Sequence, residues 1–120
     1  MKIYEYKNCS TCKRALKFLD GKKIKYDCRS IVDSPPTLSE LKRMLNYLKK
    51  EGLEFKALFN TSGQLYREMK IAEKLKNGMG EVEALKLLSQ NGKLIKRPFL
   101  LTEKFGTVGF KEDFWKKIFN

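Results

Sequence analysis

The stretch Lys2-Ile3-Tyr4-Glu5-Tyr6-Lys7-Asn8-Cys9-Ser10-Thr11-Cys12 decides the fold, because it leads from a strand into a helix through two cysteines. Its first half has the composition of a short strand. After Cys9, apolar residues recur at the i, i+3, i+4 and i+7 spacing of a helix with one buried face, namely at Cys12, Ala15, Leu16 and Leu19. We therefore expect Cys9 at the N-terminus of a helix.

A cysteine in that position is chemically activated. The free N–H groups and the positive end of the helix dipole stabilise a thiolate, and Lys7, Lys13 and Arg14 add positive charge nearby. The thiolate is the reactive form of cysteine. Cys12 follows one helical turn later, within reach of a disulfide with Cys9. The C-x-x-C spacing in a strand–helix context predicts redox chemistry, with Cys9 as nucleophile and Cys12 as resolving thiol.

Other uses of the cysteines receive less support. The third, Cys28, lies in the alternating run Ile24–Arg29 and shares a face with Ile24 and Tyr26, so we expect it to be a small buried side chain. A structural zinc site needs four ligands, and a chain with three cysteines and no histidine predicts no metal site. An inert structural disulfide remains the alternative to a redox pair.

Size and charge narrow the function classes. A chain of 120 residues with 42% hydrophobic residues predicts one soluble domain over residues 1–120. The net charge is +12, and the first 29 residues hold nine Lys or Arg against three Asp or Glu. Such a field attracts oxyanions, glutathione carboxylates, acidic proteins or nucleic acid, although most of these lysines are expected to be simple solvated surface. No nucleic-acid-reading motif accompanies them, so we expect no sequence-specific nucleic-acid binding.

The sequence also predicts where in the cell the protein is located. No apolar run is long enough to span a bilayer, the N-terminus shows no secretory segment, and three cysteines do not make a disulfide framework. We expect a cytoplasmic protein without membrane association.

The order of predicted elements indicates an α/β protein with a thioredoxin-like fold. A βαβ half and a ββα half form a four-stranded mixed sheet, and a helical insertion occupies about residues 35–91. Gly21 is expected to end the first helix, and Gly52 the second, which opens with a capping box at Thr37-Leu38-Ser39-Glu40. The predicted strands are 2–7, 24–29, 94–101 and 106–110. The predicted helices are 10–21, 37–50, 53–58, 64–70, 81–90 (with Val82, Leu85 and Leu88 inward) and 112–119.

Pro98 supports this architecture. A proline at the start of the strand after the insertion is either a cis-proline beside the cysteines or an ordinary trans proline at a strand edge. The architecture favours cis.

With these motifs in order, the chain resembles the arsenate reductase family of the glutaredoxin-coupled type, which also includes the Spx transcription regulators. The resemblance covers essentially the whole length. The segments that carry it are Cys9-Ser10-Thr11-Cys12, Pro35-Pro36-Thr37, Phe59-Asn60-Thr61-Ser62-Gly63, Lys96-Arg97-Pro98 and Val108-Gly109-Phe110.

The resemblance implies roles for individual residues. Cys9 matches the nucleophile that attacks arsenate, and Arg97 matches an arginine that contacts the oxyanion, a role suited to a bidentate guanidinium. A surface position beside the sheet is the alternative for Arg97. The expected oxyanion pocket adds the start of the helix, Ser10, Thr11 and Arg14, with Pro98 and Asn60 close to the site. No bound cofactor is implied; glutathione with glutaredoxin, or thioredoxin, is the expected reductant and protein partner.

Departures from the family pattern leave two functions open. Asn60 stands where arsenate-reducing members carry an arginine. Those members carry another arginine in the final hairpin, where this chain reads Thr107-Val108-Gly109. We therefore favour a thiol oxidoreductase acting on a small oxyanion or disulfide, with arsenate turnover weak. The alternative is an Spx-like redox switch that binds the C-terminal domain of the RNA polymerase α subunit through a glycine after the second helix, where this chain has Gly52.

Overall fold

The computed structural model describes residues 1–119, and a four-stranded mixed sheet lies at the centre of it. The strand order is β2-β1-β3-β4, with β1 parallel to β2 and antiparallel to β3, and β3 antiparallel to β4. This confirms the predicted fold class. The strands are β1 (Lys2–Glu5), β2 (Asp27–Ser30), β3 (Phe99–Leu101) and β4 (Gly106–Val108).

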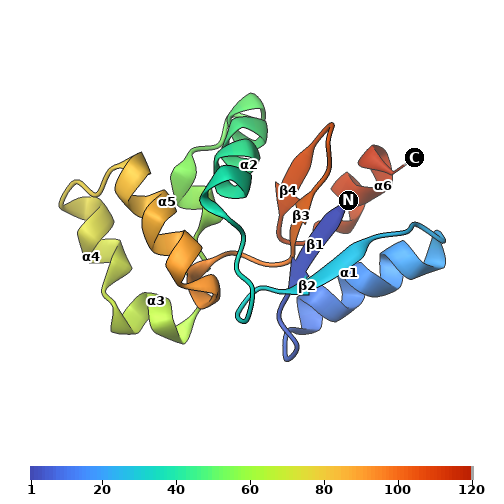
Figure 1. Ribbon diagram of the computed structural model, residues 1–120, viewed down its shortest axis with the longest axis horizontal. Helices are drawn as coiled ribbons and strands as arrows, with labels where there is room; N and C mark the ends of the chain where they lie inside the picture. The colour runs from blue at the N-terminus through green and yellow to red at the C-terminus, as the bar shows by residue number, and fades with distance from the viewer. Residues whose placement is uncertain (120) are drawn as a thin grey trace.

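Helices cover both faces of this sheet (Figure 1). Two of them, α1 and α6, pack on one face, and α2, the first helix of the insertion, packs on the other. The helices α3, α4 and α5 of the insertion lie on the left of the view, away from the sheet. Within residues 1–119 no helix is both long and apolar enough to cross a membrane. The helices are α1 (Ser10–Gly21), α2 (Leu38–Lys50), α3 (Gln64–Glu68), α4 (Ile71–Lys76), α5 (Glu81–Gln90) and α6 (Glu112–Ile118), with 3₁₀ helices at Phe55–Leu58 and Gly92–Leu94.

Successive side chains of β1 point to opposite faces of the sheet, and each face has its own hydrophobic core. Ile3 belongs to the core under α1 and α6, with Leu19 and Trp115, whereas the next residue, Tyr4, belongs to the core shared with α2 and the insertion. Ile3 pairs with Leu100 on one side, and Tyr4 pairs with Phe99. The strand that precedes the cysteines is therefore held from both faces and from both neighbouring strands, so the turn that follows it has a fixed starting point.

A buried carboxylate ties the insertion to β1. Glu40 completes the capping box of α2 with Thr37, as predicted, and also accepts hydrogen bonds from the Tyr4 hydroxyl at 2.7 Å and the Lys2 ammonium at 3.1 Å. Burial of Glu40 favours its neutral form, but the Thr37 N–H, Tyr4 and Lys2 outweigh it, so its pKa is lowered. The first turn of α2 is thereby anchored to the central strand.

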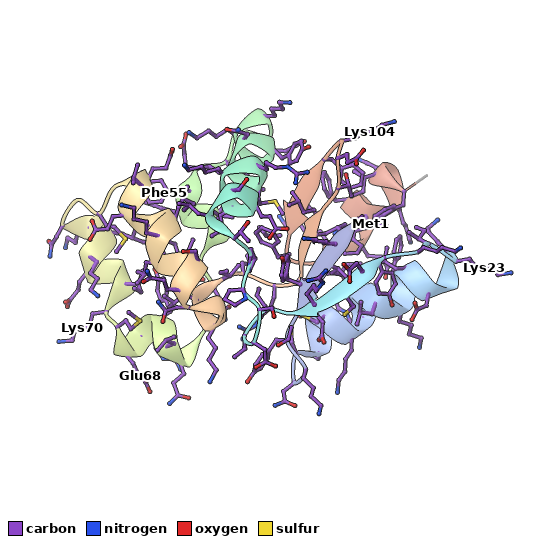
Figure 2. The ribbon with its side chains drawn as sticks, in the orientation of Figure 1. Met1, Lys23, Phe55, Glu68, Lys70 and Lys104 are labelled. Atoms are coloured by element: carbon purple, nitrogen blue, oxygen red, sulfur yellow. The ribbon has the colours of Figure 1, made fainter. Side chains whose placement is uncertain are left out.

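The structure confirms some predicted boundaries and corrects others. The first helix ends at Gly21, as predicted, but the left-handed residue that closes it is Lys23, with φ +57°, rather than the glycine. The N–H groups of Lys23 and Ile24 donate to the carbonyls of Asp20 and Leu19. The Lys23 side chain points into solvent at the far right of Figure 2. Gly52 does end α2, with φ +79°. The third strand starts only at Phe99, because residues 92–94 form a 3₁₀ helix instead.

Other corrections concern burial and the insertion. Cys28 is exposed rather than buried, because β2 is an edge strand whose four residues lie outside the core. Val82 is 66% exposed and does not join the inward face of α5. The short helix α4 was not predicted; it is separated from α3 by Lys70, whose φ of +53° breaks the helical path. The segment predicted as helix 53–58 is a 3₁₀ helix at Phe55–Leu58.

We predict that Glu40→Ala lowers the free energy of unfolding by about 3 kcal/mol, because it removes a cap and leaves the buried Tyr4 hydroxyl without an acceptor. Glu40→Gln keeps an acceptor and serves as the matched control, with a loss of about 1 kcal/mol. Urea unfolding monitored by circular dichroism measures both. Equal losses in the two variants would contradict the anchoring role.

The stabilisation that Glu40 gives to the fold decreases at low pH. The pKa of Glu40 is lower in the folded than in the unfolded chain, so its charge-dependent stabilisation is present above the unfolded pKa and is lost as the pH falls through the folded value. The stability gap between wild type and Glu40→Gln therefore narrows on acidification.

Candidate active site

Cys9 is the N-cap residue of α1. Its backbone is extended, with φ −98° and ψ 116°, and its sulfur accepts a hydrogen bond from the Cys12 N–H at 3.3 Å. The Cys9 N–H in turn donates to the Tyr6 carbonyl at 3.0 Å, which closes the turn between β1 and α1. Sulfur thus fills the position that a serine or aspartate oxygen takes at most helix starts. The side chain is half-buried, so a substrate can still reach it.

The surroundings of Cys9 favour the thiolate. Partial burial is the largest single effect and raises the pKa, but it is outweighed by hydrogen bonds from the Cys12 N–H and thiol, by the positive charge of Arg97 and by the Thr11 N–H. The net pKa of Cys9 is lowered. A lowered pKa increases the share of the nucleophilic thiolate at a given pH.

Cys12 has the opposite character. It is fully buried in the first turn of α1, and burial raises its pKa to about 12, with further raising contributions from its hydrogen bond to Cys9 and the charges of Cys9 and Glu5. The two thiols are therefore unlike: Cys9 ionises first and faces solvent, whereas Cys12 stays protonated behind it. In the part of the chain that the structure describes, all three cysteines are free thiols.

Arg97 is held over the site from the segment that enters β3. It precedes Pro98, which is buried, and the Arg97–Pro98 peptide bond is cis, as predicted. The Arg97 guanidinium stacks on the Tyr6 ring, with Cζ 4.4 Å from the ring centroid, and Nη1 donates to the Lys93 carbonyl at 3.3 Å. This stacking places a cation beside Cys9, and among residues 1–119 no carboxylate forms an ion pair with it.

A cleft of about 680 Å³ opens beside Cys9. Cys9 and Thr11 form one wall, the loop from Asn60 to Gly63 and the helix α3 form another, and the segment between β4 and α6 forms a third. Among residues 1–119, the side chains that line the cleft include cations and neutral polar groups but no carboxylate. The cations are Arg67, Lys96, Arg97 and Lys111.

The predicted site residues divide into two groups. The structure brings Cys9, Thr11, Asn60 and Arg97 to this one cleft. Ser10 and Arg14 do not line it: Ser10 is exposed at the start of α1, and the Arg14 guanidinium lies 5.6 Å from the centre of the Phe110 ring. Their predicted part in oxyanion binding stays a prediction.

Sequence reasoning missed four residues of the site. The sequence indicates Tyr6 only as a strand residue. Lys96 was not predicted, although its place beside Arg97 in the same short motif was a usable signal. Arg67 and Lys111 reach the cleft from α3 and from the approach to α6, and only tertiary packing reveals this. Residues 1–119 contain no cluster of side chains suited to a metal ion.

Comparison with known proteins identifies the family. The ArsC family profile matches residues 4–118, and the chain belongs to this family. The fold is similar to that of an ArsC-family-related protein from Bacteroides fragilis, with a TM-score of 0.86 and 45% identity over 98% of this chain and 95% of that one. It is also similar to a protein from Streptococcus mutans UA159 described as a possible arsenate reductase, with a TM-score of 0.81 and 40% identity over 96% of both chains.

A transcription regulator is also among the relatives. The global transcriptional regulator Spx of Enterococcus faecalis is 28% identical over 114 residues, which cover 92% of this chain and 80% of that protein. Membership of the family therefore brings both an enzymatic and a regulatory precedent.

We predict that Arg97→Gln raises the pKa of Cys9, because it removes a positive charge that stabilises the thiolate. The rate of iodoacetamide alkylation against pH reports this pKa, and its midpoint in wild type lies below the ~8.5 of a free thiol. Lys104→Gln, at the outward-pointing tip of the β3–β4 hairpin (Figure 2), is the control with the same loss of charge. A midpoint that moves equally in both variants would rule out a local role for Arg97.

Proposed function

We propose that the protein is a thiol oxidoreductase in which Cys9 attacks a disulfide or an oxyanion and Cys12 resolves the product. The observation that carries the proposal is the contrast between the two thiols. Cys9 has a lowered pKa in a cationic cleft, and Cys12 lies one turn away with its proton retained. Such a pair suits a reducing compartment, and we place the protein in the cytoplasm.

The reaction with a disulfide balances without a cofactor. The Cys9 thiolate attacks one sulfur, the substrate S–S bond breaks, and the first half leaves as a thiolate that takes a proton. Cys12 loses its proton and attacks the Cys9 sulfur, which forms the Cys9–Cys12 disulfide and releases the second half. The protein loses two electrons and the substrate gains them. Glutathione with glutaredoxin, or thioredoxin, then restores the dithiol.

An oxyanion such as arsenate follows a related course. The Cys9 thiolate attacks arsenic, and a hydroxyl group takes a proton and leaves as water. A second thiol, Cys12 or glutathione, then attacks the Cys9 sulfur to form a disulfide, and the electron pair of the broken S–As bond stays on arsenic, which leaves as arsenite. Arg97 and the N–H groups at the start of α1 would hold the oxygens. Asn60 offers an amide in the cleft rather than a fixed charge, so we propose that arsenate is turned over slowly.

The test is turnover by the purified protein with glutathione and glutaredoxin, offered arsenate or a small disulfide. Cys9→Ser abolishes turnover of both, because no other thiol has the nucleophilic setting of Cys9. Cys28→Ser, at the exposed third cysteine, is the matched control and retains the wild-type rate. With the disulfide substrate and no glutathione or glutaredoxin, Cys12→Ser stops after the first step, and mass spectrometry of the intact protein detects the mixed disulfide on Cys9. Full turnover by Cys9→Ser would end the proposal.

The second candidate function is redox-dependent binding of the RNA polymerase α C-terminal domain. It is supported by the Spx relative and by Gly52, which ends α2 with open space around it. A pull-down with the purified α domain tests it. Gly52→Arg adds a long side chain there, and Gly52→Ala is the control for backbone strain at φ +79°. Binding lost only in Gly52→Arg, with no turnover by wild type, would favour the regulator over the enzyme.

A further inference from the structure

The cations of the cleft are more numerous than one small oxyanion beside Cys9 requires. Arg97 stands next to the nucleophile, whereas Arg67, Lys96 and Lys111 line the cleft from other segments of the chain. Within residues 1–119 none of these three forms an ion pair with a carboxylate. Like charges gathered without a counter-charge repel one another, so an anionic ligand would relieve the cluster.

One of these side chains is hydrogen-bonded in place, and another lies against the backbone of a glycine. The Arg67 Nη1 donates to the Ser62 carbonyl at 3.2 Å, which fixes the guanidinium against the loop at the rim. The stem of Lys96 lies across Gly109, and a Cβ there would come within 3.1 Å of the Lys96 Cε. Gly109 also has φ +78°, so the chain uses glycine where the lysine crosses.

The size of the cleft indicates an organic ligand. A volume of about 680 Å³ is in the range of pockets that bind metabolite-sized molecules. A single tetrahedral oxyanion would fill only a corner of it. A disulfide with a negatively charged group on each side would place its sulfur at Cys9 and its charges at the cations.

We infer that Arg67, Lys96 and Lys111 form a second anion subsite, which receives the carboxylates of a small acidic disulfide while Cys9 attacks its sulfur. This inference rests on the proposed function, because it names the substrate class of the same site. The bonds that form and break are those of the disulfide reaction given above: two electrons pass from the Cys9–Cys12 dithiol to the substrate, which leaves as two thiols.

The experiment uses three small disulfides of similar length: dithiodipropionate, with two negative charges; bis(2-hydroxyethyl) disulfide, which is neutral; and cystamine, with two positive charges. The second-order rate of oxidation of the reduced protein is followed for each by quenched free-thiol titration. The cleft variant is Arg67→Gln/Lys96→Gln/Lys111→Gln. The matched control, Lys74→Gln/Lys76→Gln/Lys104→Gln, loses the same charge at exposed positions on α4 and the hairpin, outside the cleft.

We expect the cleft variant to react about tenfold more slowly with dithiodipropionate, and within twofold of wild type with the neutral disulfide, because each exposed charge contact is modest and three act together. The rate with cystamine is unchanged or higher. The control variant stays within twofold of wild type with all three probes. Raising the salt concentration narrows the gap between wild type and the cleft variant for the acidic probe alone.

The outcomes separate the subsite from the thiol chemistry. Equal losses in the cleft and control variants with dithiodipropionate would show a general charge effect and overturn the subsite. The subsite is also overturned if the cleft variant loses as much rate with the neutral probe as with the acidic one. If wild type reacts with none of the three disulfides through Cys9, the proposed disulfide chemistry fails, and the subsite as stated fails with it.

Discussion

The hydrogen bond from the Cys12 N–H to the Cys9 sulfur is the interaction on which this site depends. The start of a helix leaves N–H groups without partners, and here a sulfur accepts one of them at 3.3 Å. An ionised sulfur accepts it better, so helix formation and thiolate formation support each other. Because the pKa of Cys9 is lowered on folding, this stabilisation is present above the pKa of the unfolded thiol and is lost as the pH falls through the folded value.

Local features of the site were predictable from sequence because they depend on residues close together in the chain. The spacing after Cys9 predicted α1 and its N-terminal cysteine, the capping box predicted the start of α2, and the element order favoured a cis-proline at Pro98. Each of these follows from a helix period, a cap or a turn. The sheet followed from the order of the elements, because a βαβ unit with a short connection has one favoured handedness.

Features that depend on distant partners could not be predicted in this way. The alternation of apolar and polar residues predicted a buried Cys28, but β2 lies at the edge of the sheet and Cys28 is exposed there. Arg67 lies on a five-residue helix with no motif, and only the packing of the insertion brings it to the cleft that Cys9 also lines. The stacking of Arg97 on Tyr6 joins segments from opposite ends of the chain, and no spacing rule anticipates it.

We propose that Cys9 and Cys12 form one redox pair and that Cys28 takes no part in it. Disulfide mapping by mass spectrometry after mild oxidation of the purified protein, with remaining thiols alkylated, tests this directly. We expect an intramolecular Cys9–Cys12 disulfide, with Cys28 alkylated. A disulfide that includes Cys28, or Cys9 and Cys12 both recovered as alkylated thiols after oxidation, would contradict this proposal.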